Sequence, residues 1–204
     1  RARGVAVEVL SPADLARAEP NLRPGLAGAL RVPGDRVLYP PNVVRWLLAG
    51  ARAAGARVWE GAAVDRIEDR AVVVDRQRRE AEAVINAAGP EASRLTPGLP
   101  IEPRKGHLVI TDRYPGFCHH QLVELGYLKS AHPLGRESVA FNIQPRATGQ
   151  LLVGSSRELV GWDASVNPGI RHRMVERAVS FLPRLSALSA LRTWIGFRPT
   201  TGPI

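Results

Sequence analysis

Apolar and polar residues follow two different patterns along this 204-residue chain. In the first half, two stretches place apolar residues at helical spacing. The first begins at Ser11-Pro12, where the serine has the form of a helix N-cap, and should end near Pro20. The second follows Pro40-Pro41-Asn42 and should end at Gly55.

Short apolar segments between turn residues predict the strands of this first half. They cover residues 5–10, 27–32, 56–60, 62–68 and 71–74. The polar run 76–80 is expected to be a hairpin tip. Residues 83–85 predict a strongly apolar strand that ends in Asn86-Ala87-Ala88-Gly89, and such a glycine end is typical of an edge that faces a ligand.

After a linker over residues 90–103, the pattern changes to short strands separated by Pro, Gly and charged turns. These strands are expected at residues 106–111, 122–128, 138–143, 150–155 and 191–197. Residues 168–182 carry one apolar stripe at helical spacing. The second half therefore predicts an antiparallel sheet with a covering helix.

Composition narrows the class of protein. The chain is 45% hydrophobic, but no apolar run approaches the roughly 20 residues that span a bilayer. The net charge of +9 comes almost entirely from scattered arginines without interleaved aromatics, so nucleic-acid binding is not expected. One cysteine, Cys118, cannot form an internal disulfide, and a reducing, cytoplasmic location is the expectation. The only methionine is Met174, so Arg1 is not expected to be a natural translation start.

No self-contained catalytic or metal motif is present. The sequence contains neither G-x-G-x-x-G nor the P-loop pattern. Cys118, His119 and His120 are adjacent, and adjacent side chains rarely ligate one ion together, so no metal site is expected. The acids form no spaced pair suited to general acid/base work, and no catalytic side chain is expected.

Four local patterns occur in an informative order. They are V-I-N-A-A-G at 84–89, I-E-P-R-K-G-H at 101–107, Q-P-R-A-T-G-Q-L-L-V-G at 144–154 and W-I-G-F-R-P-T-T at 194–201. In this order and spacing they resemble the D-amino-acid oxidase and glycine oxidase family of FAD-dependent oxidoreductases. Upstream segments, among them Tyr39-Pro40-Pro41-Asn42, fit the same family, so the resemblance covers nearly the whole chain.

The resemblance implies an α+β fold in two parts. Residues 1–100 would be part of an FAD-binding lobe, an α/β remnant with a helical connection. Residues 101–204 would be a mainly antiparallel β substrate-binding domain with covering helices. The implied activity is oxidation of a C–N bond of a small amino acid or amine, by hydride transfer from the α-carbon to flavin.

The resemblance also assigns roles to individual residues. Val64 would lie with its backbone against the adenine of FAD; alternatively it is a core β residue. Ala87, Ala88 and Gly89 would let the cofactor approach the backbone, or they would serve tight strand–helix packing instead.

The expected substrate residues lie in the second half. Arg198, between Phe197 and Pro199 at the end of an apolar strand, would bind the substrate carboxylate, the alternative being an internal salt bridge. Asn142 would line the pocket, at a position where relatives can carry tyrosine, or it would face solvent. Lys105 and His107 would lie near the flavin edge or face water.

The departures from the family pattern matter for activity. The dinucleotide-binding turn and the segment that follows R-P-x-T are missing, and Glu91 stands where tryptophan is common. We therefore expect an interior piece of the enzyme that alone neither holds FAD tightly nor turns over. The alternative is a non-catalytic binding or assembly module of the same fold. A homo-oligomer or a companion subunit would be compatible with either, and the substrate, the electron acceptor and the oligomeric state stay open.

Overall fold

The computed structural model describes residues 4–127 and 137–201. Contacts group the chain into two compact units. One combines Arg1–Arg36 with Pro103–Arg198, and the other combines Val37–Glu102 with Pro199–Ile204. The N-terminal segment therefore belongs with the second half of the chain. The sequence predicted a cofactor-binding part over residues 1–100 and a substrate-binding part over residues 101–204, and this division of roles stays a prediction.

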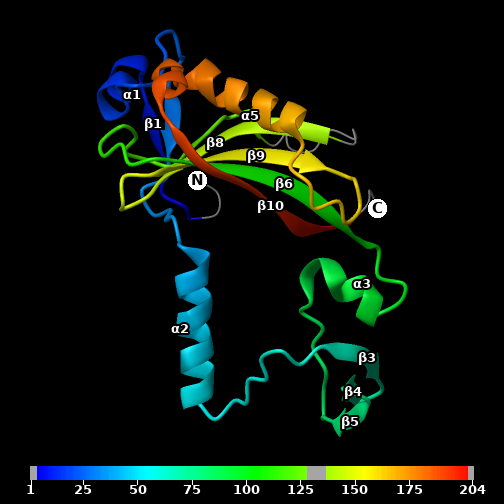
Figure 1. The fold of residues 1–204 in the computed structure, drawn as a ribbon. Coiled ribbons are helices and arrows are strands. Elements are labelled where there is room, and N and C mark those ends of the chain that lie inside the picture. The colour runs from blue at the N-terminus through cyan, green and yellow to red at the C-terminus, as the bar shows by residue number, and fades with distance from the viewer. Residues whose placement is uncertain (1–3, 128–136, 202–204) are drawn as a thin grey trace. The chain divides into compact units, whose positions relative to one another are not determined.

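The first unit contains a five-stranded sheet in the order β10-β6-β9-β8-β7 (Figure 1). Its strands are β6 (Ile101–Thr111), β7 (Leu122–Val123), β8 (Glu137–Pro145), β9 (Leu151–Glu158) and β10 (Ala190–Thr201). The pairs β6–β9, β9–β8 and β8–β7 are antiparallel. The predicted antiparallel sheet and mixed fold class are thereby confirmed.

Helix α5 (Pro168–Phe181) lies across one face of this sheet (Figure 1). Its N-cap Asn167 accepts hydrogen bonds from the backbone N–H groups of Gly169 and Ile170. Met174 is fully buried under the helix, and the ring of Phe181 stacks on Phe141 of β8 with centroids 4.5 Å apart. The short 3-10 helix η2 (Pro183–Ala187) leads from α5 to β10.

The N-terminal segment adds a small satellite to this unit. It consists of the paired strands β1 (Glu8–Leu10) and β2 (Ala29–Arg31) and the helix α1 (Pro12–Ala18). Ser11 caps α1 as predicted, in a capping box with Asp14. The buried carboxylate of Glu19 accepts hydrogen bonds from the backbone N–H groups of His119 and His120, and so ties this segment to the loop after β6.

The second unit contains α2 (Pro40–Ala53) and an antiparallel three-stranded sheet. The strands are β3 (Val64–Glu68), β4 (Ala71–Val74) and β5 (Gln77–Glu80). A 3-10 turn η1 (Gly89–Glu91) and a short helix α3 (Ala92–Leu95) follow. No residue of α2 is buried, and the side of Trp46 and Leu47 is exposed. None of the described helices is long and apolar enough to cross a bilayer.

Most predicted elements are confirmed within a few residues, and four predictions are wrong. Residues 56–60 and 83–85 form no strand among the described residues, and the side chain of Ile85 is 90% exposed. Residues 77–80 pair with β4 instead of forming a tip, because Asp75 and Arg76 make the turn at positive φ. The strand predicted at 122–128 is only β7; its last residue, Leu128, lies outside the described residues.

Candidate functional site

The face of the five-stranded sheet opposite α5 brings together residues from four strands. Phe141 and Ile143 of β8 belong to the core under α5, so the intervening Asn142 lies on the opposite face. Asn142 pairs with Gly154 of β9. A Cβ on Gly154 would lie 3.1 Å from the side chain of Leu108, which places that part of β6 on the same face. We call this surface the polar face.

Arg198 of β10 lies on the polar face, directly over β6. A Cβ built on Gly106 would lie 2.5 Å from Nη1 of Arg198 and 2.7 Å from Nη2. The guanidinium therefore occupies the space that any side chain at Gly106 would fill. Its Nη1 donates to the carbonyl of Ser156 at 3.2 Å, which holds the guanidinium on this face.

A second guanidinium, that of Arg157, reaches the same region from β9. It stacks 5.0 Å from the ring centre of Tyr127, and its Nη2 donates to the hydroxyl of that tyrosine at 2.9 Å. The Tyr127 hydroxyl in turn lies 3.1 Å from Oγ of Ser155. Burial raises the pKa of Tyr127, but the hydrogen bond with Ser155 and the charge of Arg157 lower it overall.

The polar face carries uncompensated positive charge. Burial lowers the pKa of Arg198, and so do the neighbouring Arg157 and Arg104; the one group that opposes them is Tyr127. Burial and Arg157 lower the pKa of Arg104 as well. No carboxylate of the described residues acts on either group. The internal salt bridge considered for Arg198 is therefore not formed among these residues.

Three buried polar atoms on this face have no hydrogen-bond partner among residues 4–127 and 137–201. They are Nε of Arg104, Nη1 of Arg157 and Oδ1 of Asn142. Buried groups of this kind are normally satisfied, because each unmade hydrogen bond costs about 1–3 kcal/mol. Two unused donors and one unused acceptor fit a bound molecule that has an anionic end and an N–H group.

Lys105 and His107 do not face water, which corrects one of the two positions considered for them; the position near the flavin edge stays a prediction. Both side chains are fully buried on the α5 side of the sheet. Nζ of Lys105 donates to Asp163 at 2.8 Å, and the backbone N–H of Asn167 donates to Nε2 of His107 at 2.9 Å. Strand alternation explains this, since positions 105 and 107 point away from the face that Gly106 occupies.

The residues predicted to bind the cofactor lie in the second unit, around α3. Arg94 of α3 donates to the carbonyl of Val64 at 3.1 Å. The Asn86 side chain donates to the Ala92 carbonyl and to Thr96, and accepts from the N–H of Ala88.

This segment leaves backbone open to an approaching group. Ala87 is exposed, and Gly89 has φ of 58° with nothing within 4 Å of the place where a Cβ would lie, so its left-handed backbone, not crowding, favours glycine. Small, locally ordered residues that leave room beside the backbone fit a dinucleotide edge.

No group of residues suited to a metal ion occurs in the part of the chain that the structure describes. Cys118 is buried, and burial raises the pKa of its thiol to about 12, so the side chain is an unreactive thiol. His120 bonds to Glu19 with Nδ1 at 2.8 Å. These contacts of Cys118 and His120 thus hold the loop.

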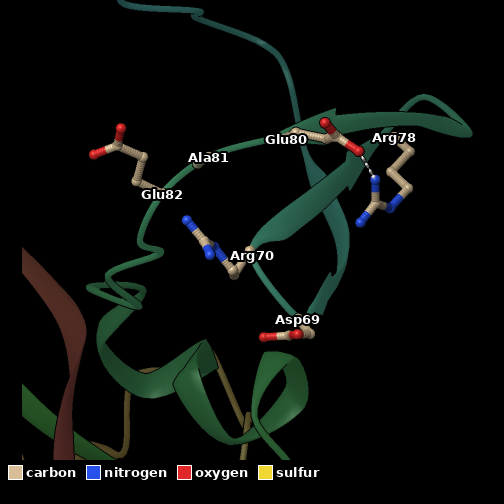
Figure 2. A pocket seen from close by; sticks show the side chains of 6 residues that line it. All are labelled: Asp69, Arg70, Arg78, Glu80, Ala81 and Glu82. Carbon is tan, nitrogen blue, oxygen red and sulfur yellow. Dashed lines mark hydrogen bonds and ion pairs between the residues drawn. The ribbon is translucent and has the colours of Figure 1, made fainter.

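An open pocket of about 530 Å³ lies on the second unit, lined by Asp69, Arg70, Arg78, Glu80, Ala81 and Glu82 (Figure 2). One of its two arginines is already held in ion pairs. Arg78 forms ion pairs with Glu68 and Glu80, the latter drawn as a dashed line in Figure 2. No buried, unpartnered donor of the described residues points into it, so the polar face is the better candidate site.

The sequence predicted roles for Arg198 and Asn142, which lie on the polar face and whose binding roles stay predictions, but it did not point to Arg104, Arg157 or Tyr127. The three arginines are 53 and 41 residues apart in the chain, and only the strand order β10-β6-β9 brings them together. One local signal existed. Gly106 stands between charged residues in a strand, which often marks a close approach of another group.

Comparison with known proteins identifies the family to which the chain belongs. A family model described as FAD dependent oxidoreductase (DAO) matches residues 1–204. The bifunctional protein ThiO/ThiG of Synechocystis sp. is 30% identical over 192 residues, which are 90% of this chain and 27% of that protein. Hydrogen cyanide synthase subunit HcnC of Pseudomonas aeruginosa is 28% identical over 204 residues, covering 95% of this chain and 46% of that protein.

The same relationship appears in solved structures. The crystal structure of glycine oxidase from Geobacillus kaustophilus superimposes with a TM-score of 0.84 at 25% identity, over 100% of this chain and 54% of that one. The chain thus spans about half or less of the relatives it matches. The chain belongs to the DAO family of FAD-dependent oxidoreductases, together with glycine oxidase.

Proposed function

We propose that the complete protein oxidises the C–N bond of a small amino acid or amine on the polar face. The observation that carries this proposal is the Arg198 guanidinium, which is held over Gly106 without a carboxylate partner among the described residues. A guanidinium forms paired, charge-assisted hydrogen bonds with a carboxylate, so the substrate carboxylate is the natural counter-ion.

The residues of the polar face would act by positioning. Arg198 would hold the carboxylate, and Oδ1 of Asn142, which lacks a partner among the described residues, would accept a hydrogen bond from the substrate N–H. FAD, when bound, supplies the acceptor for the hydride that leaves the α-carbon. The nitrogen lone pair then forms the C=N bond, a nitrogen-bound proton passes to water, and water hydrolyses the resulting imine. No described acid or base is required at the reacting carbon, and holding the substrate in one orientation is the main contribution of these side chains.

Val64, Ala87, Ala88 and Gly89 are proposed to contact the cofactor. Their support is the position of Val64 beside Arg94 of α3, the small residues at 87–89, and the match of the family over these positions. Residues 1–100 would then act with the cofactor lobe and residues 101–204 as the substrate domain.

We also propose that residues 1–204 act as part of a longer enzyme. The exposed side chain of Trp46 on α2 and that of Ile85 are apolar surface that further polypeptide, a second copy or a companion subunit would cover. Residues 1–204 expressed alone should therefore lose flavin during gel filtration. Retained flavin would contradict this.

Product analysis tests the proposed reaction. The protein from the complete reading frame, with flavin bound, is incubated with glycine, sarcosine, proline and alanine enantiomers, and the 2-oxo acid or aldehyde is measured. Formation of the carbonyl product in proportion to flavin content is the expected result. A flavin-loaded protein that forms no carbonyl product from any amine would favour the non-catalytic alternative.

A further inference from the structure

The polar face holds more positive charge than one carboxylate needs. A single carboxylate satisfies one guanidinium through two hydrogen bonds. Arg198 lies over β6, Arg104 is on β6 itself and Arg157 reaches in from β9. Arg157 and Arg104 each lower the pKa of Arg198, so the three charges lie close enough to repel one another.

The extra arginines keep donors that no described residue uses. Nη2 of Arg157 donates to Tyr127, but Nη1 of Arg157 and Nε of Arg104 are buried and have no partner in the described part of the chain. By contrast, two arginines of α5 have carboxylate partners: Arg177 pairs with Glu124, and Arg173 pairs with Glu137. The unused donors therefore mark a place for a second anionic group.

The donors come from different strands, so the two anionic groups would bind at different places on the polar face. Arg198 comes from β10 and Arg157 from β9, with β6 between them. These strands are two sheet spacings apart, roughly 10 Å between backbones. The Arg198 side chain extends over Gly106, and the Arg157 guanidinium lies beside Tyr127, close enough to lower the pKa of Arg198. One short molecule with an acidic group at each end could contact both guanidiniums.

We propose that the substrate is an amine or amino acid with two carboxylates, one held by Arg198 and the other by Arg157 together with Arg104. This rests on the proposed function, because it takes the Arg198 carboxylate as given. Tyr127 acts as a positioning residue, since it holds the Arg157 guanidinium through its ring and its hydroxyl.

Matched substrates test the proposal in the complete, flavin-loaded enzyme. Sarcosine and iminodiacetate share a secondary amine and a reacting CH₂ next to a carboxylate, but only iminodiacetate has a second carboxylate. Alanine and aspartate, in both enantiomers, form a second pair. We expect kcat/KM for the dicarboxylate to exceed that for its partner by at least about 10-fold in one of these pairs, the size of one charged hydrogen-bonding contact.

The preference should depend on Arg157. Arg157→Met should lower the ratio of the two kcat/KM values by about 10- to 100-fold. Arg157→Lys keeps the charge and should restore part of the ratio, which a purely structural role of the Tyr127 stack would not predict. Arg113→Met, an exposed arginine outside the polar face, is the control and should leave the ratio unchanged. Equal use of both members of both pairs, or a ratio that Arg157→Met does not alter, would overturn the proposal.

A binding measurement separates this proposal from the proposed function. Calorimetric titration with malonate and acetate requires no turnover. Malonate should bind more tightly than acetate, and Arg157→Met should remove the difference. If no amine is oxidised but the preference for malonate over acetate depends on Arg157, the proposed reaction is refuted and the site for two carboxylates stands. If amines are oxidised but malonate and acetate bind equally, the site for a second carboxylate is refuted and the proposed reaction stands.

Discussion

At the scale of single residues, Gly106 decides where the Arg198 guanidinium lies. A methyl group at this position would lie 2.5 Å from Nη1 of Arg198. Because the displaced atoms are the end of a flexible side chain, we expect Gly106→Ala to cost little folding stability. It should nevertheless displace the Arg198 guanidinium, the group proposed to bind the substrate carboxylate. A misplacement of about 1 Å can cost up to about 100-fold in rate.

The matched control for this substitution is Gly196→Ala on β10, where nothing lies within 4 Å of the added carbon. Steady-state kinetics should show a raised KM for Gly106→Ala and normal values for Gly196→Ala. Normal KM values in both variants would show that Arg198 is not held by the space over Gly106.

His107 makes the stability of the first unit depend on pH. Its Nε2 accepts the N–H of Asn167, so the ring is neutral with its proton on Nδ1, beside Ser156 and Glu158. Burial lowers its pKa, opposed by Glu158 and Asp163 and aided by Lys105 and Arg171. Protonation therefore favours the unfolded state. The contribution of the neutral His107 ring to folding stability is complete above the ordinary histidine pKa of about 6.5, and it is lost as the pH falls below that value.

We expect the melting temperature to fall between about pH 7 and pH 5, with a contribution from His107 of at most about 1.4 kcal/mol per pH unit. His107→Gln, whose amide oxygen can still accept from Asn167, should flatten this part of the profile. His172→Gln changes an exposed histidine of α5 and serves as the control. An unchanged slope in His107→Gln would refute the neutral buried ring.

At the scale of elements, α5 holds the strands that carry the site. Ile170, Met174 and Ala178 on its buried side are nearly inaccessible, and they pack against β8 and β9. Met174→Ala should lower the free energy of unfolding by about 2–5 kcal/mol through the cavity it leaves. Glu176→Ala on the exposed side should change it by no more than about 0.5 kcal/mol. Chemical denaturation of both variants checks this, and similar values would contradict the packing role.

The same elements show how far sequence could lead. Helix α1 and helix α5 were predictable because their caps and stripes are local signals. Residues 83–85 were predicted as a strand, but a strand also needs a partner, and none of the described residues pairs with them. Residues 77–80 were misassigned because their polar side chains hide a strand that is exposed on both sides.

At the scale of the whole molecule, the arginines lie in two kinds of environment. Much of it lies on the exposed surface in ion pairs, for example Arg52 with Glu60 at 2.5 Å. Three arginines instead converge on the polar face without acidic partners among the described residues. Arg198 was predictable from its place in the family motif, whereas the convergence of Arg104 and Arg157 depends on strand order and could not be predicted from local pattern.

The most direct test of this account is anaerobic reduction of the bound flavin by substrate, comparing the complete protein with its Arg198→Leu variant. We predict that the flavin absorbance of the unmodified protein bleaches at a rate that saturates with amino-acid substrate. In Arg198→Leu the half-saturating concentration should rise by about 30-fold or more, as expected for loss of a charged pair worth at least about 2 kcal/mol. Equal saturation curves for the two proteins would contradict the role of Arg198, and with it the placement of the substrate on the polar face.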